Sequence, residues 1–160
     1  MVTLASISMQ FTAPSRILHP QIKTMLRSAF VKDDVSFQSG WYNLWLEPVL
    51  LPHEYGDPEK KQRPKFISMA ELRERITRLP TLSLLFADQL LMINLKIIDD
   101  WEGRFLIFPK TVITDAFWLE DCAPFMIRHP VTKQWNVWFH HIQHANTPRA
   151  YFVCGKRIAS

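Results

Sequence analysis

Basic residues interleaved with aromatic residues are the part of this chain best suited to chemistry, and that chemistry is the binding of a polyanion. Lysine and arginine contact phosphate groups, and an aromatic ring stacks on a base. One group lies within a proline-rich segment, a second flanks a His-Pro pair, and a third lies near residue 150. The predicted nucleic-acid-binding residues are Lys60, Lys61, Arg63, Lys65, Arg128, Lys133, Arg149, Tyr151, Lys156 and Arg157.

A histidine cluster offers a second chemistry, the binding of a metal ion. His140 and His144 are four residues apart, so on a helix their imidazoles would share one face, as zinc sites often require. The local sequence HHIQH lacks the glutamate that serves as the base in HExxH metalloproteases. No spacing recommends a third ligand from among Asp115, Glu120, Asp121 and Cys122. We expect a polar helix face without metal or cofactor, and a metal hydrolase stays open as a third option.

Covalent catalysis has weaker support in the sequence. Cys122 follows Asp121, an acid that raises the pKa of a neighbouring thiol, and Cys154 lies in a predicted strand. The four glycines are far apart, so none of the glycine-rich loops that hold nucleotide phosphates is present. We therefore expect a protein that is not an enzyme.

Length and composition indicate a single domain over residues 1–160. Its 160 residues are 48% hydrophobic, which is enough for one core. Lys and Arg exceed Asp and Glu by 19 − 15 = 4, which suits a polyanionic partner and also suits ordinary solubility. Two isolated cysteines predict a reducing, cytoplasmic location, and no apolar run reaches the roughly 20 residues that cross a bilayer. Residues 1–32 lack acidic residues, so import into an organelle is an alternative.

The elements that must position these residues follow from hydrophobic periodicity and turn residues. The helix at 68–79 has the clearest signals, because Ser68 and Glu71 form a capping box and Pro80 ends it. Residues 52–65 are polar and rich in proline, which predicts a long exposed loop. The pattern predicts an α+β fold, in which an antiparallel meander packs against two or three helices. Strands are expected near 3–11, 36–50, 81–87, 90–98, 103–109 and 150–155, and helices near 19–31, 68–79 and 130–144.

Residues 82–143 carry a further pattern, in the order Lys96, Ile97, Ile98 and Asp99, then Gly103, Phe105 and Pro109, then His129 and Pro130. This order resembles the stage V sporulation protein G (SpoVG) family of small α+β nucleic-acid-binding proteins. The resemblance implies a core at 81–145 with a strand-helix-strand extension at 1–66, and a homodimer. The chain departs from the family at Asp100 and Trp101, at Arg128, and in the long segment between Pro109 and His129.

A short internal repeat suggests that one chain could by itself resemble a dimer. The pentapeptide that begins at His19 and ends at Lys23 recurs, with two changes, from His129 to Lys133. Each copy is predicted to open a helix, so one chain could form an internal pseudo-dimer, although a single pentapeptide is a weak repeat.

Together these patterns predict a non-catalytic regulatory protein that binds DNA or RNA mainly through phosphate contacts. The alternative is a protein-binding module, an inhibitor or assembly factor, that uses the aromatic segment 37–46 and the loop 52–65. A contiguous basic face would favour nucleic acid. Exposure of Trp41, Trp45 and Tyr42 together with dispersed basic residues would favour a protein partner.

Overall fold

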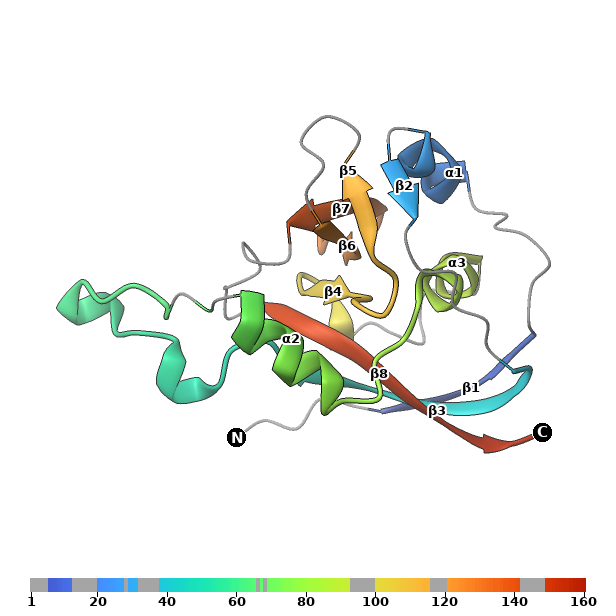
Figure 1. The fold of residues 1–160 in the computed structure, drawn as a ribbon, viewed down its shortest axis with the longest axis horizontal. Helices are drawn as coiled ribbons and strands as arrows, with labels where there is room; N and C mark the ends of the chain where they lie inside the picture. The colour runs from blue at the N-terminus through green and yellow to red at the C-terminus, as the bar shows by residue number, and fades with distance from the viewer. Residues whose placement is uncertain are drawn as a thin grey trace.

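The computed structural model describes residues 6–12, 20–27, 29–31, 38–65, 67, 69–92, 100–115, 121–141 and 149–160. These residues form one eight-stranded sheet that packs against helices, which confirms the predicted α+β class (Figure 1). The strands are β1 (Ile7–Phe11), β2 (Ala29–Val31), β3 (Gly40–Pro48), β4 (Phe105–Ile107), β5 (Ile113–Asp115), β6 (Asp121–Arg128), β7 (Trp135–His141) and β8 (Ala150–Ala159). The helices are α1 (Pro20–Leu26), α2 (Met69–Thr77) and α3 (Leu84–Met92), with 3-10 turns η1 (Pro52–Glu54) and η2 (Pro58–Lys60).

The sheet is mixed and does not follow chain order. Its strand order is β1-β3-β8-β4-β6-β5-β2, and β7 pairs with β6. Neighbours are antiparallel except β4 and β8, which run parallel. Because β7 pairs with β6 from Cys122 to Arg128, β4 and β5 share the other edge of β6. The expected meander is thus replaced by a sheet in which β8 lies beside β3, far from it in sequence.

Two hydrophobic cores lie on opposite faces of β3 and β8, because alternate side chains of a strand point to opposite faces. Tyr42, Leu44 and Leu46 pack in the core that contains α3, whereas Trp45 packs with Phe152 against the residues of α2. Helix α2 therefore covers one face of this part of the sheet, and α3 covers the other. The predicted strands near 3–11, 36–50, 103–109 and 150–155 correspond to β1, β3, β4 and β8.

The prediction of strands at 81–87 and 90–98 was wrong over the described residues, because 84–92 form helix α3. Leu84, Phe86, Leu90 and Leu91 are all buried, so the helix is apolar on nearly every side. A helix of this kind lacks the amphipathic period that identifies helices in a sequence. The N–H of Leu84 donates to Oγ1 of Thr111 at 2.9 Å, a cap supplied from distant sequence. Residues 93–98 lie outside the described part.

The helix predicted at 130–144 was also wrong over the described residues 130–141, because His129 and Pro130 lie in the turn of the β6–β7 hairpin. The N–H of His129 donates to the carbonyl of Gln134 at 2.9 Å, and its Nδ1 accepts from the N–H groups of Val131 and Thr132. Beyond the turn, buried and exposed residues alternate from Trp135 to Phe139, as they do in a strand. His140 therefore lies on a strand and not on a helix, and His144 lies outside the described residues.

The helix predicted at 19–31 ends at Leu26, and residues 29–31 form β2, which pairs with β5. Helix α1 lies beside β7, where the side chain of Gln21 occupies the strand edge. Its Nε2 donates to the carbonyl of Trp135 at 2.9 Å, and its Oε1 accepts from the N–H of Val137 at 3.1 Å. These two bonds take the place of a neighbouring strand and protect the edge from pairing with other chains. Of the two pentapeptide copies, only the one at 19–23 begins a helix.

Candidate nucleic-acid interface

Residues 52–65 form an arm that projects from the body of the protein after β3 (Figure 1). Proline begins both of its 3-10 turns, where a fixed φ and a missing N–H are tolerated. Asp57 accepts two bonds through its carbonyl, from Lys60 at 3.1 Å and Gln62 at 2.8 Å. Gly56 has a φ of 75°, and a Cβ there would lie 2.5 Å from the carbonyl oxygen of Arg63. The arm is therefore folded on itself and needs glycine at its narrowest point.

The base of the arm is fixed to helix α2 by a buried carboxylate. Glu54, only 4% exposed, accepts two parallel bonds from the guanidinium of Arg75, at 2.8 and 2.6 Å. Its Oε1 also accepts from the N–H of Leu51 at 2.8 Å, and Arg75 donates to the carbonyl of Val49 at 2.6 Å. Chiefly through the Arg75 bond, the pKa of Glu54 is lowered from 4.5 to about 2, although burial opposes this. The arm thus starts from a fixed position at the end of β3.

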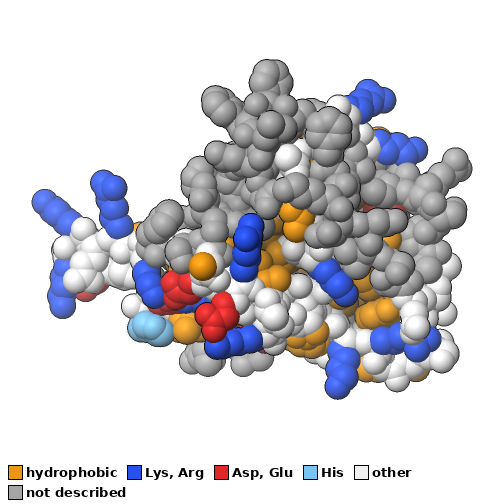
Figure 2. Space-filling model, viewed as in Figure 1, with side chains coloured by type: hydrophobic (Ala, Val, Ile, Leu, Met, Phe, Trp, Pro, Cys, Tyr) orange, Lys and Arg blue, Asp and Glu red, His pale blue; other side chains and the backbone are white. Residues whose placement is uncertain are grey.

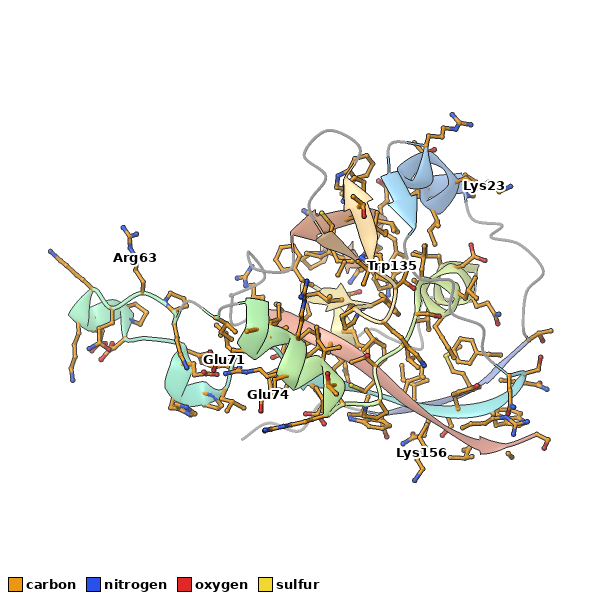
Figure 3. The ribbon with its side chains drawn as sticks, in the orientation of Figure 1. Lys23, Arg63, Glu71, Glu74, Trp135 and Lys156 are labelled. Carbon is orange, nitrogen blue, oxygen red and sulfur yellow. The ribbon has the colours of Figure 1, made fainter. Side chains whose placement is uncertain are left out.

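Lys65 belongs to this anchor, although the sequence predicted it as a nucleic-acid contact. Its Nζ lies 3.4 Å from Glu54 and 3.1 Å from Glu71, and these bonds, first that to Glu71, raise its pKa. Figure 3 shows Glu71 near this base, whereas Arg63 extends from the outer part of the arm. The ammonium of Lys65 is therefore compensated within the protein.

The tip of the arm, residues 57–63, carries the other three predicted cations of this segment. Lys60, Lys61 and Arg63 are exposed, and no ion pair joins them to an acidic residue among the described residues. Two carboxylates, Asp57 and Glu59, share the tip, so its net charge is 3 − 2 = +1. Oδ1 of Asp57 accepts from the N–H of Glu59 at 3.0 Å. Figure 2 shows Lys and Arg side chains gathered at the outer end of the arm.

A second group of predicted residues lies on β8. Lys156 and Arg157 are exposed, and Nε of Arg157 donates to the carbonyl of Ser39 at 3.1 Å. Tyr151 is half-buried and lies under the guanidinium of Arg104, 5.7 Å from its ring centroid. Arg149 is exposed just before the strand. Residues 156 and 157 lie near the end of β8 that is opposite to the arm (Figure 1).

The last two predicted residues, Arg128 and Lys133, lie on the β6–β7 hairpin, and both pair with Glu102, which precedes β4. Arg128 is buried and lies 3.3 Å from Glu102, and Lys133 lies 2.8 Å from the same carboxylate. Lys133 has a φ of 60°, a left-handed conformation that the turn imposes. The ten predicted residues therefore occupy three separate regions and do not form one basic face. The arm tip and the β8 group each have three exposed cations, but those of the tip lie within four consecutive residues, whereas those of β8 are spread from 149 to 157.

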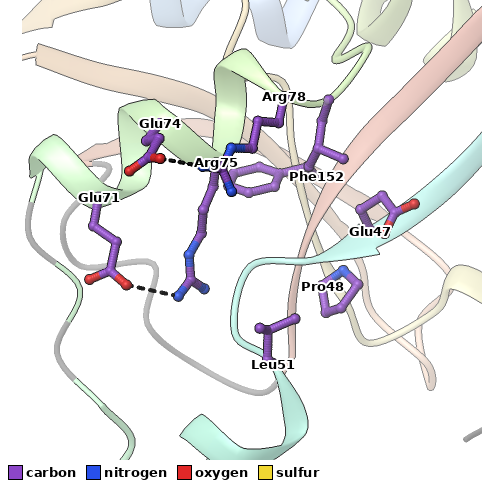
Figure 4. Close-up of a pocket in the computed structure, with 9 residues that line it drawn as sticks. Glu47, Pro48, Leu51, Glu71, Glu74, Arg75, Arg78 and Phe152 are labelled. Carbon is purple, nitrogen blue, oxygen red and sulfur yellow. Dashed lines mark hydrogen bonds and ion pairs between the residues drawn. The ribbon is translucent and has the colours of Figure 1, made fainter.

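A groove of about 360 Å³ lies between helix α2 and the end of β3, beside the base of the arm (Figure 4). Both of its guanidinium groups are already paired, because Arg75 bonds to Glu71 and Arg78 bonds to Glu74. Three carboxylates and two guanidinium groups line it, together with Pro48, Leu51, Leu79 and Phe152. The groove thus lacks the free cations that a phosphate would need.

The described residues hold neither a metal-binding cluster nor an exposed cysteine. No three His, Cys, Asp or Glu side chains converge there as a metal-binding set. Cys122 and Cys154 are both buried, and burial raises the pKa of Cys154 to about 12. A thiol with this pKa is almost wholly protonated near neutral pH and is a weak nucleophile.

Sequence reasoning missed the anchoring role of Glu54 and Arg75. The only signal was the position of Glu54, three residues after Leu51 in a loop predicted as exposed. Arg75 also pairs with Glu71, four residues earlier on the same helix, at 3.1 Å. Its stronger bidentate bond to Glu54 links elements 21 residues apart, which sequence spacing does not reveal.

Comparison with known proteins adds no relative. No family model, no curated protein and no solved structure matches this chain. The resemblance to the SpoVG family therefore stays a prediction, and two elements expected with it, a strand hairpin at 82–98 and a helix after His129, differ in the described residues. No helix of the described residues is long and apolar enough to span a membrane.

Proposed function

We propose that this protein binds nucleic acid without catalysing a reaction, and that the arm tip makes its main phosphate contacts. The observation that supports this proposal most is the set of three exposed cations, Lys60, Lys61 and Arg63, on a projection with a fixed base. A projection can enter a groove or follow a phosphate backbone that a flat surface meets only at its edge. Because the anchor holds the base of the arm, less conformational entropy is lost on binding.

The chemistry of the tip favours a polyanion over a protein as its partner. From Asp57 to Arg63 the only apolar side chain is that of Pro58. Protein interfaces depend on buried aromatic or large aliphatic anchors, and the tip has none. Binding by the tip must therefore come mainly from charge, and charge is the part of nucleic-acid affinity that depends on salt.

The test is a fluorescence anisotropy titration at 50 and 200 mM salt, with a labelled single strand of about 20 nucleotides and a labelled duplex of about 20 base pairs. The test variant replaces Lys60, Lys61 and Arg63 with glutamine. The control variant makes the same substitutions at exposed cations elsewhere, Lys23, Arg27 and Lys110. Both variants lose three positive charges, so a difference between them reports position and not net charge.

We expect the tip variant to bind roughly tenfold to several-hundredfold more weakly at 50 mM salt, and to show a flatter salt dependence. Each lost phosphate contact lowers the slope of log K against log salt by about 0.7 to 0.9. The control should stay near the wild type. Equal losses in both variants would contradict a specific role for the arm tip.

A protein partner is the second candidate, because the cations are dispersed and two large apolar side chains are exposed near the start of β3. Trp41 is 42% exposed and Ile158 is 58% exposed. The combined surface predicted from 37–46 and 52–65 has less support, since Tyr42 is buried and the arm leaves the opposite end of β3. Failure to bind either oligonucleotide at 50 mM salt would remove the first candidate and leave this one.

A further inference from the structure

Helix α2 covers only the half nearer the arm of its face of β1, β3 and β8. Over the other half of that face, no helix among the described residues covers the strands. Near the arm, α2 covers this face over Phe152 and Cys154, which are fully buried. Two residues further along β8, on the same face, Lys156 is exposed. Figure 3 shows its side chain directed away from the sheet. The open half begins where α2 ends its contact.

Side chains from three adjacent strands share this open half. Cross-strand pairing aligns Ser8 of β1 with Asn43 of β3, and Asn43 with Lys156 of β8. Gln10 of β1 lies opposite Trp41 of β3. Ser8, Gln10 and Lys156 are exposed, and Asn43 is partly so. The open half thus presents one indole ring beside hydroxyl, amide and ammonium groups.

The backbone around Trp41 is shaped for this exposure. The β3–β8 register shifts between Trp41 and Tyr42, which leaves Ile158 unpaired. Gly40 has a φ of 152°, and a side chain there would clash with the carbonyl of Ala159. The absence of a Cβ at Gly40 lets the two strands approach closely at the shift. Trp41 and Ile158 both remain exposed at this point.

The charge of this surface identifies the chemistry of its partner. Its described members are Ser8, Gln10, Trp41, Asn43, Lys156 and Ile158, which include one cation and no carboxylate. Arg157 adds a second exposed cation at the same end of β8. The carboxylate of Glu47 lies opposite Phe152, at the covered end. An anionic partner that also stacks on a flat ring matches this set.

We propose that the open half of this face binds single-stranded nucleic acid, with a base stacked on Trp41 and a phosphate contacted by Lys156. This inference rests on the proposed function and names the class of nucleic acid. A single strand exposes the faces of its bases to an aromatic side chain, whereas a duplex keeps them stacked inside. Serine and amide side chains beside the ring supply hydrogen bonds to base edges.

The test compares Trp41→Ala with Trp138→Ala, because Trp138 is similarly exposed, at 47%, on a different strand, β7. Both variants are titrated with a labelled oligothymidylate of about 20 nucleotides and with a duplex of equal length at 50 mM salt. We expect Trp41→Ala to weaken single-strand binding about 5- to 150-fold, the usual effect of losing one stacked base, and to leave duplex binding unchanged. Trp138→Ala should leave both unchanged.

Two further variants separate stacking from loss of structure. Trp41→Phe keeps a ring and should restore most of the single-strand affinity, whereas Lys156→Gln should reduce the salt slope by about 0.7. If Trp41→Ala weakens single-strand binding no more than Trp138→Ala, or weakens duplex binding equally, this inference is overturned while the proposed function stands. A change of oligomeric state in Trp41→Ala with unaltered affinity assigns the face to a second copy and also overturns it. Absence of binding to both nucleic acids by the wild type overturns both proposals.

Discussion

The substitution Glu54→Gln should destabilise the protein far more than its place in an arm suggests. Glutamine keeps the shape and can still accept the bond from the N–H of Leu51, but it loses the charge that faces Arg75. The pKa of Glu54 falls from 4.5 to about 2, which at 1.36 kcal/mol per pKa unit sets an upper bound of about 3 kcal/mol. Arg75 retains Glu71 and the carbonyl of Val49 as partners. We therefore expect a loss of about 2 kcal/mol.

The assay is urea unfolding followed by tryptophan fluorescence across a pH series. Because the folded pKa of Glu54 is depressed, its contribution is complete above pH 4.5 and is lost as the pH falls towards 2. The difference between wild type and Glu54→Gln should be largest at pH 7 and shrink between about pH 5 and pH 2. At pH 7 a loss of this size corresponds to a decrease in Tm of roughly 4–8 °C.

Glu74→Gln is the matched control, because Glu74 also pairs with an arginine of the α2 region, Arg78, but at the surface. Their side chains are 62% and 75% exposed, and exposed pairs contribute about 0–1 kcal/mol. The reasoning is refuted if Glu54→Gln costs no more than Glu74→Gln, or if its effect is the same at pH 7 and pH 3.

Three further predictions concern the arm, the sheet edge and the thiols. Gly56→Ala should destabilise the protein by at least about 1 kcal/mol more than Gly103→Ala. Both glycines have a positive φ, but only at Gly56 would the added Cβ lie 2.5 Å from a backbone oxygen. Urea unfolding compares the two variants, and equal effects would refute the steric argument. Gln21→Leu removes two bonds at the edge of β7, so it should cost about 1 kcal/mol and accelerate amide exchange at Val137, and unaltered exchange there would count against the edge-capping role. Both cysteines are buried, so a thiol reagent should react with neither in native protein and with both in urea; rapid native reaction would contradict their burial.

The sequence predicted those parts of the fold in which local signals agree with tertiary packing. Helix α2 has a proline after it and charged pairs along it, and it formed where expected, at Met69–Thr77. The strands β1 and β3 alternate between buried and exposed residues, so period and packing coincide. These elements could be predicted because one face of each is covered and the other is not.

The wrong predictions concern elements that do not have one covered and one uncovered face, or whose structure depends on distant residues. Helix α3 is buried on almost all sides, so its sequence reads equally well as a strand or as a helix. His129 and Pro130 permit either a helix start or a turn, and the choice depended on the alternating Trp135, Val137 and Phe139 beyond them. The parallel pairing of β4 with β8 joins residues about 45 apart in sequence, and no local pattern specifies it.

The candidate site was predicted in composition but not in arrangement. The exposed cations of the arm were expected from its charge and prolines, and Lys60, Lys61 and Arg63 are exposed. Arg128 and Lys65 could not be distinguished from them in the sequence, because their partners, Glu102 and Glu54, are contributed by tertiary packing. Exposure of a charge depends on what folds against it, which composition alone does not show.

The central claim is that charge on the arm tip drives binding of nucleic acid. Its most direct measurement is the salt dependence of affinity for the wild type and for the variant with glutamine at Lys60, Lys61 and Arg63. The claim predicts tight binding at 50 mM salt, weaker binding at 200 mM, and a slope of log K against log salt that is less steep in the variant by about 2 to 3. The claim is contradicted if the wild type does not bind at 50 mM salt, or if the variant has the same slope as the wild type.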